Sequence, residues 1–416
     1  MNEPRASGDA SPPPAHPPPP DAPSGARLNI AITSPFVWPW VRRGSERFLH
    51  DMSRYLVARG HRVTVFASAP YDRVEDREGI TYHLLRQRFK SPLRQFNCCH
   101  YFAFRLQHAL GRCDPDLVFC MNYFDAYAAL RARRRRGARY KVVYHSAGII
   151  SRRYFRAVPL DAWFFRTVRR ESNLTVAVSR FAGAVFRRNF GTDPLVIPPP
   201  VMTQDFQLAG QAAASPTAAG PRVLFVGDVQ ERRKGARALV RAFARIERTF
   251  PGAQLFFAGR ANPATRQALL DEASRSGVTG EVTFLGVGRV EDLPDIYRSA
   301  SVTVLPAVGE AFGMALIESL ASGTPVVGAR HGGMPDIVDG ALVGRLFDPG
   351  EFVEETDNID GLTEAIAEVL AWGKTAEVSA ACRVHAEQFS WATLGPRYEQ
   401  AFQRIAAAHA GGRDGA

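Results

Sequence analysis

The chain is 416 residues long, 46% of them hydrophobic and 22% charged, which is typical of a globular protein with room for two α/β domains. It has no secretory segment near its start and no run of about eighteen apolar residues, so we expect a cytoplasmic protein without a membrane-spanning helix. The five cysteines lack paired metal-ligand spacing, so we expect reduced thiols rather than metal ligands. No metal site and no cofactor are expected.

The net charge of +11 is distributed unevenly along the chain. Residues 1–200 carry 32 basic and 15 acidic side chains, whereas residues 201–416 carry 20 basic and 26 acidic ones. A basic first half attracts anions such as nucleic acid, acidic phospholipid or a phosphate-bearing substrate.

Residues 1–26 contain mainly proline, alanine, serine and glycine, which predicts a disordered arm. From 27 to 200, short β-branched runs such as "RLNIAITSPF", "RVTVFASAP" and "YKVVYHSAG" alternate with helical stretches. This alternation predicts an N-terminal domain with a parallel sheet covered by helices on both faces. Three consecutive prolines end that domain, because proline cannot continue strand pairing.

A second domain follows residues 201–220, which have the composition of a linker. Residues 221–388 contain six further strand-like runs, from "RVLFVGD" to "GRLFDP", separated by helical stretches. Residues 389–416 read as an amphipathic helix that packs back toward the first domain. The prediction is two Rossmann-like, doubly wound α/β domains that face each other across a cleft, where ligands bind beyond the strand ends.

Several common catalytic motifs are absent from the sequence. No G-x-G-x-x-G opens a helix after the first strand, and no G-x-x-x-x-G-K-[ST], H-E-x-x-H, G-x-S-x-G or paired C-x-x-C occurs. The chain therefore lacks the fingerprints of dinucleotide-dependent redox enzymes, P-loop enzymes and several familiar hydrolases.

The stretch "TVLPAVGEAFGMALIESLASGTPVVG" joins a strand to a helix that we expect to begin at Phe312-Gly313. Glu310 then lies just before the helix, and Glu318 lies two turns inside it. The first backbone N–H groups of the helix, on Phe312, Gly313 and Met314, suit a diphosphate. On spacing alone, the two acids could equally be an ordinary helix-dipole partner and a solvated side chain.

A second strand-to-helix turn, "LFVGDVQERRKGA", places Gly227 before a basic group. Lys234 at the start of the next helix is well positioned to neutralise a diphosphate. A basic surface cluster made by Arg232, Arg233 and Lys234 is the alternative.

Together these stretches resemble the retaining glycosyltransferases of family four, glycosyltransferase group 1, which have the GT-B fold. The matching segments cover most of residues 222–350, and the Glu, seven residues, Glu signature followed by "SLASGTPVV" is specific. The resemblance implies a metal-independent transfer of a hexosyl group from a nucleotide-diphosphate sugar to a glycan or lipid-linked acceptor.

The resemblance also implies roles for individual residues. Glu310 would lie beside the transferred sugar, Glu318 would hold the ribose hydroxyls, and Lys234 would bind the phosphates. The cleft histidine of the family corresponds to His145, after the strand "YKVVYHS". Further donor-binding candidates are Phe312, Gly313, Met314, Gly227, Arg232, Arg233, Val287 and Arg289, and candidates on the acceptor side are Gly44, Glu46 and Ser179. Ser179 is also a candidate helix N-cap.

One position departs from the family. Members commonly have arginine directly after the Val-Gly of this turn, where it pairs with the later lysine on the diphosphate, and this chain has Asp228. We expect Arg232 or Arg233 to supply the missing cation, and we favour Arg233.

The acceptor should dock on the basic first domain, where residues 84–112 and 151–171 mix arginines with aromatic side chains. Such helices suit an anionic membrane surface, so peripheral binding at the inner membrane face is one hypothesis and a solvated arginine face is the other. A non-catalytic sugar-nucleotide-binding protein and a GT-B epimerase are alternative functions. Nucleic acid is not expected as a partner, because no recognition module is present.

Overall fold

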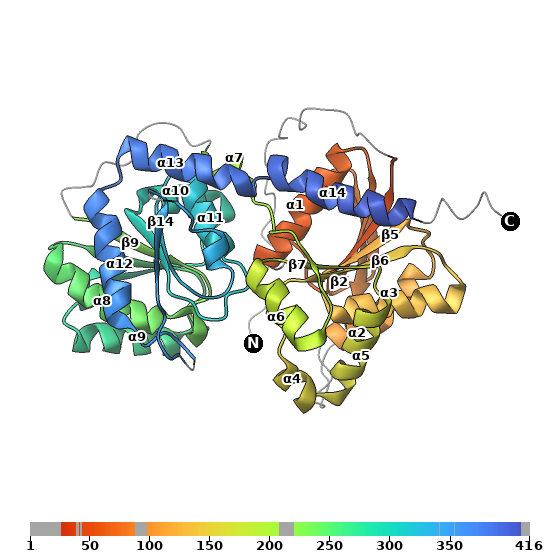
Figure 1. Ribbon diagram of the computed structural model, residues 1–416, viewed down its shortest axis with the longest axis horizontal. Helices are drawn as coiled ribbons and strands as arrows, with labels where there is room; N and C mark the ends of the chain where they lie inside the picture. The colour runs from red at the N-terminus through yellow and green to blue at the C-terminus, as the bar shows by residue number, and fades with distance from the viewer. Residues whose placement is uncertain are drawn as a thin grey trace.

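The computed structural model describes residues 26–38, 41, 44–87, 98–207, 220–340, 342–352 and 354–408. Two α/β lobes lie side by side in Figure 1, with the first lobe in red to yellow-green and the second in green to blue. Nearly all of the predicted arm, most of the predicted linker and the last eight residues lie outside the described residues.

The first lobe is built on a sheet of eight strands in the order β3-β4-β2-β1-β5-β6-β7-β8, all parallel except the β3–β4 pair. The strands are β1 (Asn29–Thr33), β2 (Arg62–Ala69), β3 (Arg73–Arg77), β4 (Ile80–Arg86), β5 (Leu117–Cys120), β6 (Lys141–Ser146), β7 (Leu174–Ala177) and β8 (Leu195–Val196). At the centre, Ile30 pairs with Val63 on one side and with Leu117 on the other. All three are buried, as expected for parallel strands covered on both faces.

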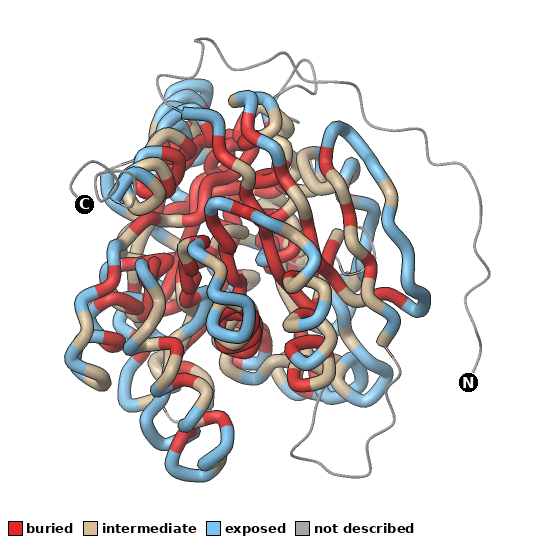
Figure 2. The backbone as a smooth tube through the Cα atoms, turned by 90° about the vertical axis from the view of Figure 1, so that its right-hand side faces the viewer, coloured by how far each residue is buried: buried red, intermediate tan, exposed pale blue. Residues whose placement is uncertain are grey.

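Helices cover both faces of this sheet. They are α1 (Gly44–Ala58), α2 (Cys98–Leu110), α3 (Tyr123–Arg136), α4 (Arg152–Ala157), α5 (Pro159–Glu171) and α6 (Arg180–Phe190). One core joins the sheet to α1 and to the C-terminal helix, and another joins it to α2, α3, α5 and α6. Figure 2 shows the buried backbone in red inside the molecule and the exposed segments in pale blue around it.

The second lobe has six parallel strands in the order β11-β10-β9-β12-β13-β14, which confirms the predicted second sheet. They are β9 (Arg222–Val226), β10 (Gln254–Ala258), β11 (Val282–Gly286), β12 (Val302–Leu305), β13 (Val326–Ala329) and β14 (Gly344–Phe347). The α-helices are α8 (Ala236–Thr249), α9 (Pro263–Arg275), α10 (Leu293–Ser299), α11 (Met314–Ala321), α12 (Ile359–Trp372) and α13 (Ala376–Ala386). Short 3₁₀ helices are η1 (Arg232–Lys234), η2 (Thr279–Glu281), η3 (Val290–Asp292), η4 (Met334–Asp336) and η5 (Glu387–Phe389).

The chain returns to the first lobe through α14 (Trp391–Ala407), which follows α13 along the top of Figure 1. Trp391 stacks on Tyr55 of α1 with ring centroids 5.2 Å apart. Tyr398 donates a hydrogen bond of 3.0 Å to the backbone carbonyl of Ile197. The last helix therefore belongs to the core of the first lobe.

Residues 201–207 differ from the flexible linker expected there. Val201 forms a bridge with Ser390, and α7 (Thr203–Gln207) packs on α10 and α11 of the second lobe. The reason is apolar burial, because Phe206 is 1% exposed and its ring lies 6.0 Å from that of Tyr297.

Candidate active site

Two strand-to-helix turns of the second lobe are locked together. The first follows β9 and includes η1, and the second follows β12 and leads into α11. The amide of Val308 donates to the carbonyl of Arg233 at 2.8 Å. Gly235 has φ 73°, and a Cβ there would lie 2.5 Å from the carbonyl oxygen of Pro306, so the close approach requires glycine.

Glu310 is the acid that joins these turns. Its Oε2 accepts hydrogen bonds from Lys234 Nζ and from Arg233, each at 3.2 Å. The Lys234 and Glu310 side chains are each 16% exposed, so water screens this pair only partly. A Cβ on Gly227 would lie 3.3 Å from the Lys234 side chain, which shows that the lysine lies over that glycine. The structure thus brings together four residues that the sequence predicts in one site, namely Gly227, Arg233, Lys234 and Glu310.

Helix α11 begins at Met314, slightly later than the predicted start. Gly313 precedes it with φ 112°, a conformation that favours glycine, and Phe312 is buried. The backbone before the helix is closely packed, since a Cβ on Gly332 would lie 2.0 Å from the Glu310 carbonyl oxygen. The start of α11 is therefore held rigidly beside Glu310.

Glu318 lies deeper, in a buried environment between the lobes. Tyr297 donates a hydrogen bond of 2.8 Å to its Oε2. Burial raises the pKa of Glu318, whereas the charge of Arg47 on α1 and the Tyr297 hydrogen bond oppose that rise. Arg47 also lies 3.1 Å from Asp205 of α7. Sequence patterns do not indicate Arg47 or Tyr297, because these contacts depend on how distant helices pack.

The first lobe touches this region through the N-termini of α1 and α6. A Cβ on Gly44 would lie 3.1 Å from the sulfur of Met314. Ser179 caps α6 by accepting from the Ala182 amide, and its hydroxyl also donates to the Ala311 carbonyl at 2.7 Å. The structure therefore brings Gly44 and Ser179 to the loop that carries Glu310.

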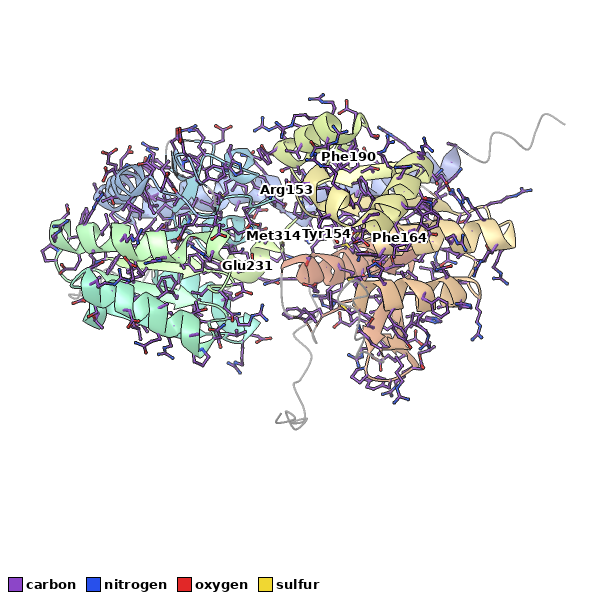
Figure 3. All side chains as sticks on the ribbon, turned by 90° about the horizontal axis from the view of Figure 1, so that it is seen from below. Arg153, Tyr154, Phe164, Phe190, Glu231 and Met314 are labelled. Carbon is purple, nitrogen blue, oxygen red and sulfur yellow. The ribbon has the colours of Figure 1, made fainter. Side chains whose placement is uncertain are left out.

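Figure 3 shows the two lobes from below. Met314 and Glu231 lie on the side of the second lobe that faces the first. Arg153 and Tyr154 of α4 lie on the facing side of the first lobe.

His145 is enclosed rather than open to solvent. It is 1% exposed, and its ring lies 5.1 Å from that of Phe48 and 5.3 Å from that of Phe119. Burial lowers its pKa to about 3, and its Nε2 lies 3.4 Å from the Tyr398 hydroxyl. This position differs from the expected cleft surface because α1 and α14 cover this part of β6.

Four other predicted site residues have surroundings that do not include Glu310. Val287 is 65% exposed, and Arg289 pairs with Asp292 at 3.1 Å. Arg232 pairs with Glu354 at 2.7 Å, and Glu46 is buried and accepts from Ser45. No described contact joins these four residues to Glu310.

Asp228 has a partner that the sequence analysis missed. Its carboxylate lies 2.5 Å from Arg260, which follows Gly259 at the end of β10. Burial by itself would raise the pKa of Asp228, but hydrogen bonds from Arg260 and Gln230 outweigh it and lower the pKa. The sequence does contain a signal, because Val-Gly-Asp and Ala-Gly-Arg end neighbouring strands.

The described residues contain neither a metal-binding cluster nor a membrane-spanning helix. No group of three or more histidine, cysteine, aspartate or glutamate side chains in that part of the chain could hold a metal ion. None of the helices described there is long and apolar enough to cross a membrane.

Two family models match the chain, one on each lobe. The model described as "Glycosyltransferase Family 4" matches residues 42–205, and the model described as "Glycosyl transferases group 1" matches residues 220–371. The chain belongs to the group 1 glycosyltransferases. The predicted family is therefore confirmed.

Among curated members of this family, similar proteins are named D-inositol 3-phosphate glycosyltransferase. The one from Corynebacterium kroppenstedtii is 32% identical over 191 residues, which is 44% of this chain and 41% of that protein. The one from Mycolicibacterium smegmatis is 35% identical over 176 residues, which is 41% of this chain and 37% of that protein. The matches thus span about two fifths of these relatives.

Solved structures of similar fold cover nearly the whole chain. Sucrose-phosphate synthase from Thermosynechococcus elongatus has a TM-score of 0.74 at 22% identity and covers 92% of this chain and 100% of its own. The Anabaena protein Alr3699/HepE in complex with UDP-glucose has a TM-score of 0.69 at 20% identity, with the same coverage. The two-lobed GT-B fold of this group 1 glycosyltransferase is therefore confirmed.

Proposed function

We propose that the protein is a retaining glycosyltransferase that moves a hexosyl group from a nucleotide-diphosphate sugar to a hydroxyl of a glycan or lipid-linked acceptor. The observation that carries the proposal is the contact of Glu310 with Lys234 at the start of α11. A carboxylate beside a lysine and a helix N-terminus suits a donor in which a sugar is joined directly to a diphosphate.

The proposed reaction takes place on one face of the sugar. The bond between the anomeric carbon and the diphosphate oxygen breaks, and a bond from the acceptor oxygen forms on the same face. The acceptor proton passes to the departing diphosphate, while Lys234 and the first amides of α11 stabilise its negative charge. These groups supply positive charge without a divalent metal, so metal independence is part of the proposal.

Two comparisons suggest the substrates to try first. The curated relatives are named for D-inositol 3-phosphate, and a structural neighbour contains UDP-glucose. The basic first lobe favours an anionic or phosphate-bearing acceptor. The first candidates are therefore a UDP-hexose donor and phosphorylated polyol, glycan or lipid-linked acceptors.

An anionic membrane surface is proposed as a further partner. Phe104 on α2, Tyr154 on α4 and Trp163 on α5 are 59%, 45% and 49% exposed. The helices α4 and α5 also carry exposed arginines, namely Arg152, Arg153, Arg156, Arg166 and Arg170. Aromatic rings next to cationic side chains suit the headgroup region of a bilayer.

The test begins with donor binding. Thermal shift with UDP-, GDP-, ADP- and dTDP-sugars identifies the donor, and product analysis with and without acceptor identifies the reaction. A transferase gives a glycosylated acceptor with retained anomeric configuration, and added chelator leaves its rate unchanged. An epimer released without acceptor supports the epimerase alternative, and binding without any turnover supports the non-catalytic alternative.

A further inference from the structure

The turn after β9 carries an acid where a diphosphate site needs positive charge, and the structure pairs that acid with an exposed arginine. The carboxylate of Asp228 lies 2.5 Å from the guanidinium of Arg260 and also accepts from the Gln230 amide at 3.1 Å. The Arg260 side chain is 67% exposed. The guanidinium is thus oriented by one acid and remains open to a ligand.

The backbone fixes where this pair sits. The Val229 amide donates to the Arg260 carbonyl at 3.0 Å, and the Gly227 amide donates to the Ala258 carbonyl at 3.0 Å. A Cβ on Gly259 would lie 1.7 Å from the Gly227 carbonyl oxygen, so the two turns are in direct contact. Both turns follow the carboxyl ends of parallel strands, the edge at which such sheets bind ligands.

The turn after β9 also lies next to Lys234, the lysine that is proposed to bind the donor phosphates. A Cβ on Gly227 would lie 3.6 Å from Lys234 Nζ. Asp228 follows Gly227 directly, so Arg260 and Lys234 both lie next to this glycine turn. Together they place two cations beside one short segment of backbone.

The sequence favours Arg233 as the second cation. Arg260, however, has fewer ion pairs to lose when it binds a ligand. Arg233 contacts two acids, Glu310 at 3.2 Å and Glu231 at 2.5 Å, whereas the described ion pair of Arg260 is with Asp228 alone. The Arg233 side chain is also less exposed, at 42%. A ligand that competes for Arg260 therefore displaces fewer charged contacts.

We propose that Arg260 is the second cation that binds the donor diphosphate, and that Asp228 orients it until the donor displaces the acid. This inference rests on the proposed function. Its consequence is that the two partners of one ion pair act in opposite directions: Arg260 strengthens diphosphate binding, and Asp228 competes with it.

The experiment measures dissociation constants of UDP, GDP, ADP and dTDP, with the matching nucleosides, for three variants. Arg260→Gln should bind the preferred nucleoside diphosphate about tenfold more weakly, because a charge-assisted contact is lost, and should bind the nucleoside unchanged. Asp228→Asn should bind the diphosphate at least as tightly as the original protein. Arg275→Gln, which removes a similarly exposed arginine that pairs with Glu272 on α9, should change neither.

Each outcome bears on one claim. If Arg260→Gln binds the diphosphate as tightly as the original protein, or if Asp228→Asn weakens binding as much as Arg260→Gln, the pair is only a structural tie and the inference is wrong. Arg260 and Arg275 are exposed, and asparagine has the shape of aspartate, so all three variants should fold. If the original protein binds none of the four diphosphates, the proposed function itself fails.

Discussion

Lys234 Nζ and Glu310 Oε2 lie 3.2 Å apart; the family resemblance implies that the lysine binds the donor phosphates and that the acid lies beside the transferred sugar. In the structure the Glu310 carboxylate pairs with the Lys234 ammonium group, in the way that a donor phosphate would. Donor binding then has to exchange one anion for another. The pair therefore keeps Lys234 oriented, and it also competes with the ligand.

The Glu310–Lys234 contact gives the first prediction. Glu310→Gln should lower the transfer rate about 100-fold, because the carboxylate beside the sugar is lost. The same variant should bind the free nucleoside diphosphate at least as tightly, because Lys234 loses its competing acid. Lys234→Ala should weaken diphosphate binding roughly 10- to 150-fold, since hydrogen bonds to charged groups contribute about 1.5–3 kcal/mol. Steady-state kinetics and calorimetry measure both effects.

Weak diphosphate binding by Glu310→Gln would contradict the competition between the acid and the phosphate. Unchanged turnover would contradict the catalytic role. Arg233→Ala is the comparison for the sequence-based prediction that Arg233 is a donor cation. That prediction fails if Arg233→Ala leaves binding unchanged while Lys234→Ala abolishes it.

Ser179 gives the second prediction, because its hydroxyl makes two contacts at once. It accepts from the Ala182 amide at 3.1 Å and donates to the Ala311 carbonyl of the other lobe at 2.7 Å. Ser179→Ala should lose about 1 kcal/mol of stability as a lost N-cap and should also weaken donor binding. Thr375→Ala, which removes the N-cap of α13, is the control.

Chemical denaturation and diphosphate titration of both variants separate the two roles of Ser179. Both should lose similar stability, but only Ser179→Ala should change binding or the small-angle scattering profile. Equal binding by the two variants would mean that the contact between the lobes has no part in donor binding.

The sequence predicts most of the second lobe because its local signals agree. Each of the six strands is an apolar run that ends at glycine, proline or a polar turn, and the Glu310–Glu318 spacing lies where a helix must begin. In the first lobe, β3 reads "RVEDR" and is largely exposed, so hydrophobic pattern gives no signal for it. It forms because β4 offers an antiparallel partner at the sheet edge.

The partners of charged residues are harder to predict than the elements that carry them. Asp228 and Arg260 are 32 positions apart and meet only because β9 and β10 are neighbours in the sheet. Arg47 reaches Asp205 of α7 through the packing of the lobes. Sequence therefore indicates which residue types are present at the site, whereas pairing follows from sheet order and lobe contact.

Trp163 gives the third prediction, which concerns the membrane surface. The variant Trp163→Ser should bind anionic vesicles several-fold more weakly at low salt, because an exposed ring that can enter the headgroup region is lost. Val384→Ser is the control, since Val384 is 73% exposed but lies on α13 of the acidic lobe. Co-sedimentation with phosphatidylglycerol vesicles measures the effect.

Failure of the original protein to sediment with those vesicles at low salt would reject membrane binding. An equal loss in the two variants would show that binding depends on general surface hydrophobicity rather than on α5. Binding that falls as salt rises is the further expectation, because exposed arginines and lipid phosphates attract each other through a screened charge interaction.

His145 gives the last prediction, a pH dependence of stability. Burial lowers its pKa in the folded protein to about 3, whereas a histidine in the unfolded chain titrates near 6.5. Between these values the unfolded state binds a proton that the folded state does not. The free energy of unfolding therefore falls as the pH falls below about 6.5, by up to about 1.4 kcal/mol per pH unit from this group.

The variant His145→Phe should remove that contribution, because a phenyl ring can occupy the space between Phe48 and Phe119 without titrating. Asp51 acts in the opposite direction, since burial raises its pKa to about 7 and its acid form is favoured on folding. Asp51 is present in the original protein and in His145→Phe. The difference between the two proteins in how the free energy of unfolding changes with pH therefore reports on His145. Urea denaturation from pH 7 to pH 4.5 measures the slopes, with His145→Gln as a second non-titrating variant. Parallel curves for all three proteins would mean that His145 is not buried in its neutral form.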